Sequence, residues 1–299
     1  MNRAYVFILM GAGLWGTIGW FVKHLYAYGF TPMEVVTLRV VTAAIVLLAY
    51  MLFASRHSLK LKSPTDIKYF IGTGLFSIVF FNFCMFTAIE LSTIPIATAL
   101  LYTGPAFVII LSLIFFKEPF TKIKAATLVI TLIGTALVAG ALPFDIDVFQ
   151  VTAILFGLGS GFGYALYSIF SKFALEKYSS LSITTYTFVL AAIALIFFFP
   201  FSEKGHLLLE GKVFLLAFGL GIIPTAFAYI VYTYGLNQTA ASHASIISTV
   251  EPVVATLIGV FVFIEPFSFS QLIGMIFVIS AVILIQFDTK KSATLQKKA

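Results

Sequence analysis

The chain of 299 residues is 61% hydrophobic and only 10% charged, and its formal net charge is +6. A water-soluble domain has about 45–50% apolar and about 25% charged residues, so this chain has too few charges to cover a surface in water. The composition therefore excludes a soluble globular protein and predicts an integral membrane protein.

Ten apolar segments follow one another along the chain, separated by charges, turn residues and Gly/Pro clusters. Each is close to the roughly 20 residues that a helix needs to cross the hydrocarbon core. The predicted fold is all-α, with transmembrane helices at 4–22, 32–53, 69–88, 95–116, 122–141, 150–174, 182–201, 213–235, 241–264 and 268–287. The longest polar stretch between them, residues 55–66, is too short for a soluble catalytic domain.

Lysine and arginine are unevenly distributed between the connections. With the N-terminus in the cytoplasm, Lys23, Lys204 and Lys212 lie outside. The cytoplasmic set is Arg3, Arg56, Lys60, Lys62, Lys68, Lys117, Lys122, Lys124, Lys172, Lys177, Lys290, Lys291, Lys297 and Lys298. Because cytoplasmic loops carry an excess of positive residues, we expect a multi-pass protein of the cell (plasma or inner) membrane with both termini cytoplasmic. The positive charge then reflects topology, and no nucleic-acid partner is expected.

The second half of the sequence repeats the first at an offset of about 147 residues. The aligned segments are FKEPF (116–120) with FIEPF (263–267), TGPAFVI (103–109) with VEPVVAT (250–256), FTAIELST (86–93) with TYGLNQTA (233–240), and WGTIGWFVK (15–23) with YALYSIFSK (164–172). Each copy holds five predicted spans, and an odd number inverts the second copy in the membrane. Inverted repeats are common in secondary transporters, whose substrate sites lie near the membrane midplane.

The repeat divides the chain into a first unit at 1–144, a second unit at 145–288 and a basic cytoplasmic tail at 289–299. Prolines inside the spans, at Pro105, Pro224 and Pro252, are expected to kink their helices because proline removes a backbone hydrogen bond.

Several of these features together resemble the EamA-type, ten-helix members of the drug/metabolite transporter superfamily. They are the two five-helix copies, the Trp15–Gly16 pair, LRVVTAAIVLL at 38–48, and in each half a proline followed about 13 residues later by Glu-Pro. Arg39 occupies the arginine position of the family pattern in the second helix. The resemblance covers nearly the whole chain and implies export or exchange of small polar metabolites, often amino acids, without ATP.

Aromatic and polar side chains within the spans are the candidates for substrate binding. They are Trp15, Arg39, Asn82, Tyr102, Tyr164, Tyr167, Tyr229, Tyr232 and Glu251. The repeat pairs Trp15 with Tyr164 and Asn82 with Tyr229, so we expect these positions to line one central cavity. The alternative is that Trp and Tyr mark the two headgroup regions.

The two charged candidates have open roles. Arg39 either extends to the outer headgroups or faces the cavity with a partner such as Glu251. Glu251 either binds a substrate amine, carries a coupling proton or hydrogen-bonds a neighbouring helix. Its aligned position in the first copy is Gly104, so the fold itself does not require a carboxylate there.

The sequence thus predicts a secondary transporter, an exporter in its family context, of small polar metabolites such as amino acids or related zwitterions. An exporter of cationic drugs or amines is an alternative, since Trp15, Tyr164 and Tyr229 offer cation–π contacts. An intramembrane enzyme acting on lipid-linked substrates is a weaker one, because it would need clustered Asp, His or Cys. The expected partners are a small-molecule substrate, the lipid bilayer and, if transport is coupled, protons, with no cofactor and no metal.

Overall fold

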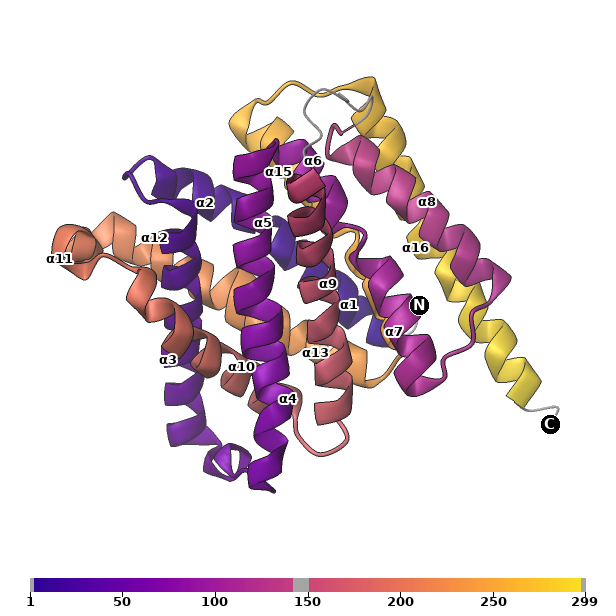
Figure 1. Ribbon diagram of the computed structural model, residues 1–299, viewed down its shortest axis with the longest axis horizontal. Coiled ribbons are helices and arrows are strands. Elements are labelled where there is room, and N and C mark those ends of the chain that lie inside the picture. The colour runs from indigo at the N-terminus through magenta and orange to yellow at the C-terminus, as the bar shows by residue number, and fades with distance from the viewer. Residues whose placement is uncertain (1–2, 142–150, 297–299) are drawn as a thin grey trace.

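The computed structural model describes residues 3–141 and 151–296, and the regular structure in these ranges is helical throughout (Figure 1). The first half contains α1 (Arg3–Gly16), α2 (Ile18–Tyr26), α3 (Pro32–Ala54), α4 (Ile67–Ile71), the π-helix η3 (Gly72–Val79), α5 (Phe80–Leu91), α6 (Ile94–Leu101), α7 (Gly104–Phe116) and α8 (Lys122–Val138). The second half contains α9 (Val151–Ala174), α10 (Ser180–Leu195), α11 (Phe201–Lys204), α12 (Gly211–Gly221), the π-helix η7 (Ile222–Phe227), α13 (Ala228–Asn237), α14 (Ala241–Ser248), α15 (Glu251–Phe263) and α16 (Phe269–Gln296).

The predicted all-α membrane fold is confirmed. Within the described residues, nine helical stretches have the length and composition to cross a membrane, and the remaining predicted span, 122–141, is the 17-residue α8. The third span is longer than predicted, Pro64–Leu91, because a 3-10 turn leads directly into its helix. The predicted boundary between the two units, at residues 144 and 145, lies outside the described residues, and α16 continues to Gln296, into the predicted tail.

Local sequence signals explain where the helices begin. At the start of α3, the Thr31 hydroxyl accepts the Glu34 N–H at 3.4 Å, and the Glu34 carboxylate accepts the Thr31 N–H at 2.8 Å. This capping box is followed by Pro32, which has no N–H to leave unsatisfied in the first turn. Thr121 caps α8 in a similar way, by accepting the Lys124 N–H at 3.1 Å.

The fourth and ninth spans are each broken into two half-helices, at equivalent positions of the two copies. The first copy breaks between α6 and α7, and the second between α14 and α15, with Pro105 and Pro252 in the first turn of the new half-helix. Kinks were expected at these two prolines, and the structure instead has full interruptions, with the new half-helix beginning one residue before the proline, at Gly104 or Glu251. The third and eighth spans contain the π-helices η3 and η7, again in corresponding places, and Pro224 lies in η7.

Small residues let the helices approach closely. α8 and α16 run side by side at one edge of the molecule (Figure 1). A Cβ added to Gly274 would lie 2.6 Å from the Gly134 carbonyl oxygen. At the centre, α1 packs on α13, where a Cβ on Gly11 would lie 2.9 Å from the Cβ of Tyr232. Such faces drive helix packing in lipid by van der Waals contact, and they bring Trp15, near the end of α1, up to the tyrosines of α13.

Candidate functional site

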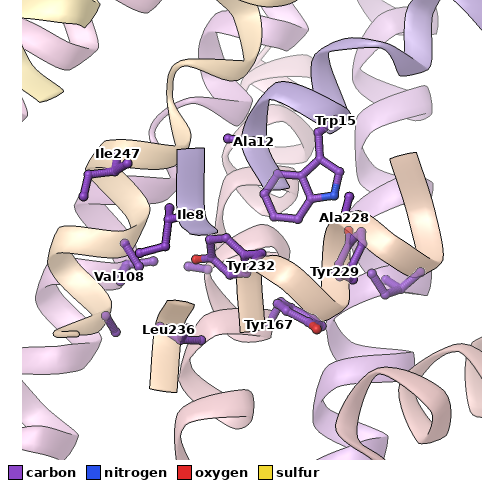
Figure 2. Packing of buried hydrophobic residues seen from close by; sticks show 14 of the residues in the cluster. Ile8, Ala12, Trp15, Val108, Tyr167, Ala228, Tyr229, Tyr232, Leu236 and Ile247 are labelled. Carbon is purple, nitrogen blue, oxygen red and sulfur yellow. The ribbon is translucent and has the colours of Figure 1, made fainter. Parts of the chain in front are cut away.

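Four aromatic side chains from three helices meet in the core of the protein (Figure 2). The ring of Trp15 lies 4.9 Å from those of Tyr229 and Tyr232, and the Tyr167 ring lies 4.9 Å from that of Tyr229. Trp15 with Tyr229 and Tyr167 with Tyr229 meet edge to face, an arrangement that aromatic quadrupoles favour, and Trp15 with Tyr232 is tilted. Trp15, Tyr167, Tyr229 and Tyr232 are each less than 10% exposed, so they lie in the protein interior and not at the headgroups.

The tyrosine hydroxyls fix these rings in place. Tyr167 is hydrogen-bonded to Thr233 at 2.7 Å, and Tyr232 to Ser168 at 2.7 Å. These two bonds join α9 to α13. Because buried hydroxyls are costly without partners, such bonds hold the rings in single orientations.

Tyr164 connects the aromatic group to the broken ninth span. Its hydroxyl is hydrogen-bonded to Ser248 at 2.9 Å, at the end of α14. Its ring packs on the other break as well, since a Cβ on Gly104 would lie 2.8 Å from Tyr164 Cδ1. One tyrosine therefore contacts both helix breaks.

These aromatic residues enclose a small cavity. Its lining consists of Trp15, Ser77, Ile78, Phe81, Tyr164, Tyr167, Ser168, Tyr229 and Tyr232. It has about 10 Å³ of space for the centre of a water molecule, which is room for roughly one water. In this conformation the aromatic group is closed on itself, so a metabolite can enter only if the surrounding helices move apart.

The two charged candidates lie beside this cavity. Arg39 is 7% exposed, so it does not extend to the headgroups, and it lies within electrostatic range of the Tyr229 hydroxyl and the Glu251 carboxylate. Glu251 is the first residue of α15 and is half-buried. Although both residues are described, no ion pair within 4.0 Å joins Arg39 to Glu251.

Two buried donors near the site have no hydrogen-bond partner in the described part of the chain. They are Arg39 Nε and Trp15 Nε1. An unsatisfied buried donor costs about 1–3 kcal/mol relative to a paired one. A ligand acceptor that reached these donors would remove that cost.

The remaining two predicted site residues, Tyr102 and Asn82, differ in whether they face the other site residues. Tyr102 is buried at the break between α6 and α7, and its hydroxyl interacts electrostatically with Glu251 and Tyr164. Asn82 is also buried, but its amide donates to the Ile78 carbonyl of its own helix at 2.7 Å and it is not part of the cavity lining.

Four lining residues were not among the predicted set: Ser77, Ile78, Phe81 and Ser168. Ser168 follows Tyr164 by four positions on α9, so helical spacing was the signal that marked it. Ser77 and Ile78 lie in the π-helix η3, which regular helical spacing does not represent.

Broken helices at equivalent positions of two five-span halves, with an aromatic cavity beside the breaks, define a multi-pass membrane transporter. The comparison with known proteins agrees, since the chain belongs to the EamA-like transporter family, which it matches over residues 2–140 and 151–287.

Proteins similar to this chain are named uncharacterized transporters. The chain is 33% identical to an uncharacterized transporter of Archaeoglobus fulgidus over 215 residues, which cover 70% of this chain and 75% of the relative. It is 26% identical to the uncharacterized transporter YxxF of Bacillus subtilis, over 98% and 93% of the two chains. A solved crystal structure shares the fold, with a TM-score of 0.76, 21% identity and coverage of 95% of this chain and 97% of the other.

Proposed function

We propose that this protein is a secondary transporter that exports a small zwitterion, such as an amino acid, by alternating access. The observation that carries the proposal is a pair of opposite charges, the buried Arg39 and the half-buried Glu251, which lie beside one aromatic cavity without an ion pair between them. Charges at membrane depth are costly unless they are partnered. A substrate carboxylate on Arg39 and a substrate ammonium group on Glu251 would partner both.

The other groups at the site support the same class of substrate. Trp15 Nε1 is a second unpaired donor for a carboxylate. The aromatic walls suit an ammonium group or an apolar side chain. A phosphorylated metabolite would need several cationic groups, and Arg39 is the one such group beside the cavity lining in the described residues.

Alternating access follows from the size of the cavity and from the helix breaks. The closed cavity holds roughly one water, so substrate binding requires a wider conformation. The half-helices α7 and α15 begin next to Tyr164 and at Glu251, respectively. A rocking movement of one repeat against the other would open the cavity toward one side at a time.

Glu251 also offers a route for proton coupling. A proton and a substrate ammonium group compete for the same carboxylate, so that binding of one releases the other. Export would then run against proton entry. In the cell, the proposed orientation places both termini in the cytoplasm, as the distribution of Lys and Arg predicts.

Ligand-induced stabilisation of the purified protein tests the substrate class. We expect zwitterionic amino acids to raise the melting temperature, because a ligand that binds only the native state stabilises it by mass action. Amines without a carboxylate and sugar phosphates are the comparison sets. Stabilisation by sugar phosphates alone would contradict the zwitterion proposal.

A second candidate function is export of cationic amines. Glu251 and the aromatic walls would bind such a cation, and Arg39 would have no part in binding it. The variant Arg39→Gln separates the two. For a zwitterion transporter, this variant loses stabilisation by amino acids. For an amine exporter, stabilisation by amines is kept or improved, because a repelling positive charge has been removed.

A further inference from the structure

The junction between the third and fourth spans is equivalent, in the repeat, to the junction between the eighth and ninth spans. The two differ in how deeply the half-helix that follows each junction is buried. We call residues 89–94, between α5 and α6, the first junction, and residues 236–242, between α13 and α14, the second junction. Every residue of α14, Ala241–Ser248, is buried. In the equivalent α6 only Ile96, Ala97 and Leu101 are buried, and Ile94 at its start is 64% exposed.

At the second junction, Glu118 binds the start of α14. Its carboxylate accepts hydrogen bonds from the Ala241 N–H at 2.8 Å, from the Ser242 N–H at 3.4 Å and from the Ser242 hydroxyl. Lys124 adds an ion pair at 3.4 Å. A carboxylate at this position satisfies free N–H groups and interacts favourably with the helix dipole.

Lys172 binds the other side of the same junction. Its ammonium group donates to the carbonyl oxygens of Leu236 at 2.9 Å and Thr239 at 2.6 Å, where α13 ends. A cation is favourable there for the same electrostatic reason. The charges of Lys172 and Glu118 also interact with each other. One acid and one base thus hold the two helix ends of the second junction.

The repeat equivalents of this acid and base are Glu265 and Lys23, aligned with Glu118 and Lys172. They form an ion pair with each other at 2.7 Å, with both side chains 51% exposed. Glu118 is 13% exposed in its position. Among the described residues, neither Glu265 nor Lys23 hydrogen-bonds the first junction.

An open pocket of about 280 Å³ lies beside the first junction, and its lining includes Thr87, Ile89 and Glu90. A pocket of about 390 Å³ also borders the second junction, at Gln238, but α14 itself is buried along its whole length. The pockets therefore do not distinguish the two junctions, but the half-helix that follows is buried at the second junction and largely uncovered at the first, so we describe the second junction as closed and the first as more open.

We propose that Glu118 with Lys172, and Glu265 with Lys23, are two alternating gate latches for the transport cycle. In the conformation seen here, the Glu118 latch is engaged on the second junction and the Glu265 latch is disengaged. In the opposite conformation their states are exchanged. The inference rests on the alternating access of the proposed function, since inverted repeats exchange conformations as one half rocks against the other.

The repeat alignment specifies the contacts of the second latch. In the opposite conformation, Glu265 accepts the Ile94 N–H at the start of α6, as Glu118 now accepts that of Ala241. Lys23 donates to the carbonyl oxygens of Ile89 and Ser92, which align with those that Lys172 now binds.

The two latches differ in strength. Ser242, which supplies two of the donors to Glu118, aligns with Pro95, which has neither an N–H nor a hydroxyl. Lys124 aligns with the uncharged Gln271. Because hydrogen bonds from charged donors are stronger than those from neutral ones, the Glu118 latch is the stronger. We therefore expect the conformation closed at the second junction to be the more populated one in the absence of substrate.

Cysteine labelling of the full chain in liposomes tests the latches without any substrate. In a Cys84→Ala background, Thr93→Cys reports on the first junction and Ala240→Cys on the second. Without further changes, we expect fast labelling at 93 and slow labelling at 240. Glu118→Ala should raise the rate at 240 and lower that at 93, shifting their ratio about tenfold or more, as the loss of hydrogen bonds to a charged group implies.

Two further variants complete the test. Adding Glu265→Ala to Glu118→Ala should return the ratio toward its original value, because both latches are then lost. Glu176→Ala, which removes an exposed carboxylate, is the matched control and should leave the ratio unchanged. If Glu118→Ala proves unfolded, Glu118→Gln, which keeps the side-chain shape, replaces it.

Two outcomes overturn the latches. One is an unchanged ratio in Glu118→Ala and Glu118→Gln. The other is faster labelling at both positions, which indicates local unfolding in place of a conformational exchange. These results are independent of the substrate: opposite shifts at 93 and 240 support the latches even if no zwitterion is transported, and transport with an unchanged ratio supports the proposed function without them.

Discussion

The half-helices α7 and α15 occupy the same place in the two repeats, and they have the same length but different chemistry. α7 runs from Gly104 to Phe116 and α15 from Glu251 to Phe263, so each boundary is displaced by the same 147 residues. Each ends in a left-handed residue, Lys117 or Ile264. The backbone of the break is therefore duplicated, whereas the carboxylate at its start is present in only one copy.

This difference separates what the fold requires from what the function uses. Proline in the first turn and a left-handed residue at the end occur in both copies, so they serve the shape of the broken span. Gly104 is replaced by Glu251 with no change in the helix start. A carboxylate that the backbone does not need, beside a buried Arg39, is the basis on which we propose that Glu251 serves substrate or protons.

The largest effect on transport is expected from removing the charge of Glu251, which only the second copy has. Glu251→Gln keeps the shape of the side chain and removes its charge. We predict a folded, inserted protein whose transport falls by about 10- to 150-fold, the equivalent of ~1.5–3 kcal/mol for hydrogen bonds to a charged group. The pH dependence of transport should be lost with it. Uptake into liposomes at several pH values measures both.

Glu176→Gln is the control for Glu251→Gln, since Glu176 is exposed in the connection between α9 and α10. It should transport at the normal rate. A Glu251→Gln variant with an unchanged rate and pH profile would show that Glu251 only packs the helix break, and proton coupling through it would be wrong.

Much of this architecture could be predicted because the sequence contains two copies of the same five-span unit. The aligned Glu-Pro pairs and the prolines at 105 and 252 located both helix breaks. The tryptophan and the four tyrosines at the cavity were found because spacings of three and four mark one face of a regular helix, whereas Phe81 was missed. Trp15, Tyr164, Tyr167, Tyr229 and Tyr232 all line the cavity.

The remaining features depend on three-dimensional packing. The π-helix η3 changes the hydrogen-bonding period and so rotates the residues around it, which is why Ser77 and Ile78 line the cavity while Asn82 bonds to its own helix. The contact of Glu118 with Ala241 joins positions 123 residues apart. Sequence periodicity carries no information about such a contact.

A smaller effect is expected from the glycines that pack against the two breaks. A Cβ on Gly161 would lie 2.7 Å from Thr103 Oγ1 and 3.0 Å from the Leu101 carbonyl oxygen. A Cβ on Gly16 would lie 2.6 Å from Val254 Cβ. Overpacking of this kind typically costs about 1–3 kcal/mol. We therefore predict that Gly161→Ala and Gly16→Ala both lower the melting temperature of the purified protein.

The matched control is Gly13→Ala, because a Cβ at Gly13 meets nothing within 4 Å. It should leave the melting temperature unchanged or raise it slightly, since alanine is the better helix former. If only one of the two crowded glycines is sensitive, close packing is needed at one break alone, and the backbone equivalence of the two copies does not extend to their neighbours.

The smallest effect is expected at the left-handed residues, where the two copies differ again. Lys117 has φ 53° and Ile264 has φ 57°, and in both copies the next residue is the glutamate of a latch. This conformation costs an L-amino acid about 1–2 kcal/mol, and more for a β-branched side chain. Glycine removes the strain but loses more entropy on folding, by about 0.5–1 kcal/mol.

The net prediction is that Ile264→Gly raises the stability by up to about 1 kcal/mol and Lys117→Gly by less, since isoleucine is β-branched and lysine is not. Ile264 is 87% exposed, so its removal takes little packing from the protein. Thermal unfolding in detergent compares the two variants, and because glycine keeps the same turn, Glu265 should still pair with Lys23 and transport should be unaffected. A loss of stability in both variants would mean that these side chains, and not only the backbone turn, hold the ends of α7 and α15.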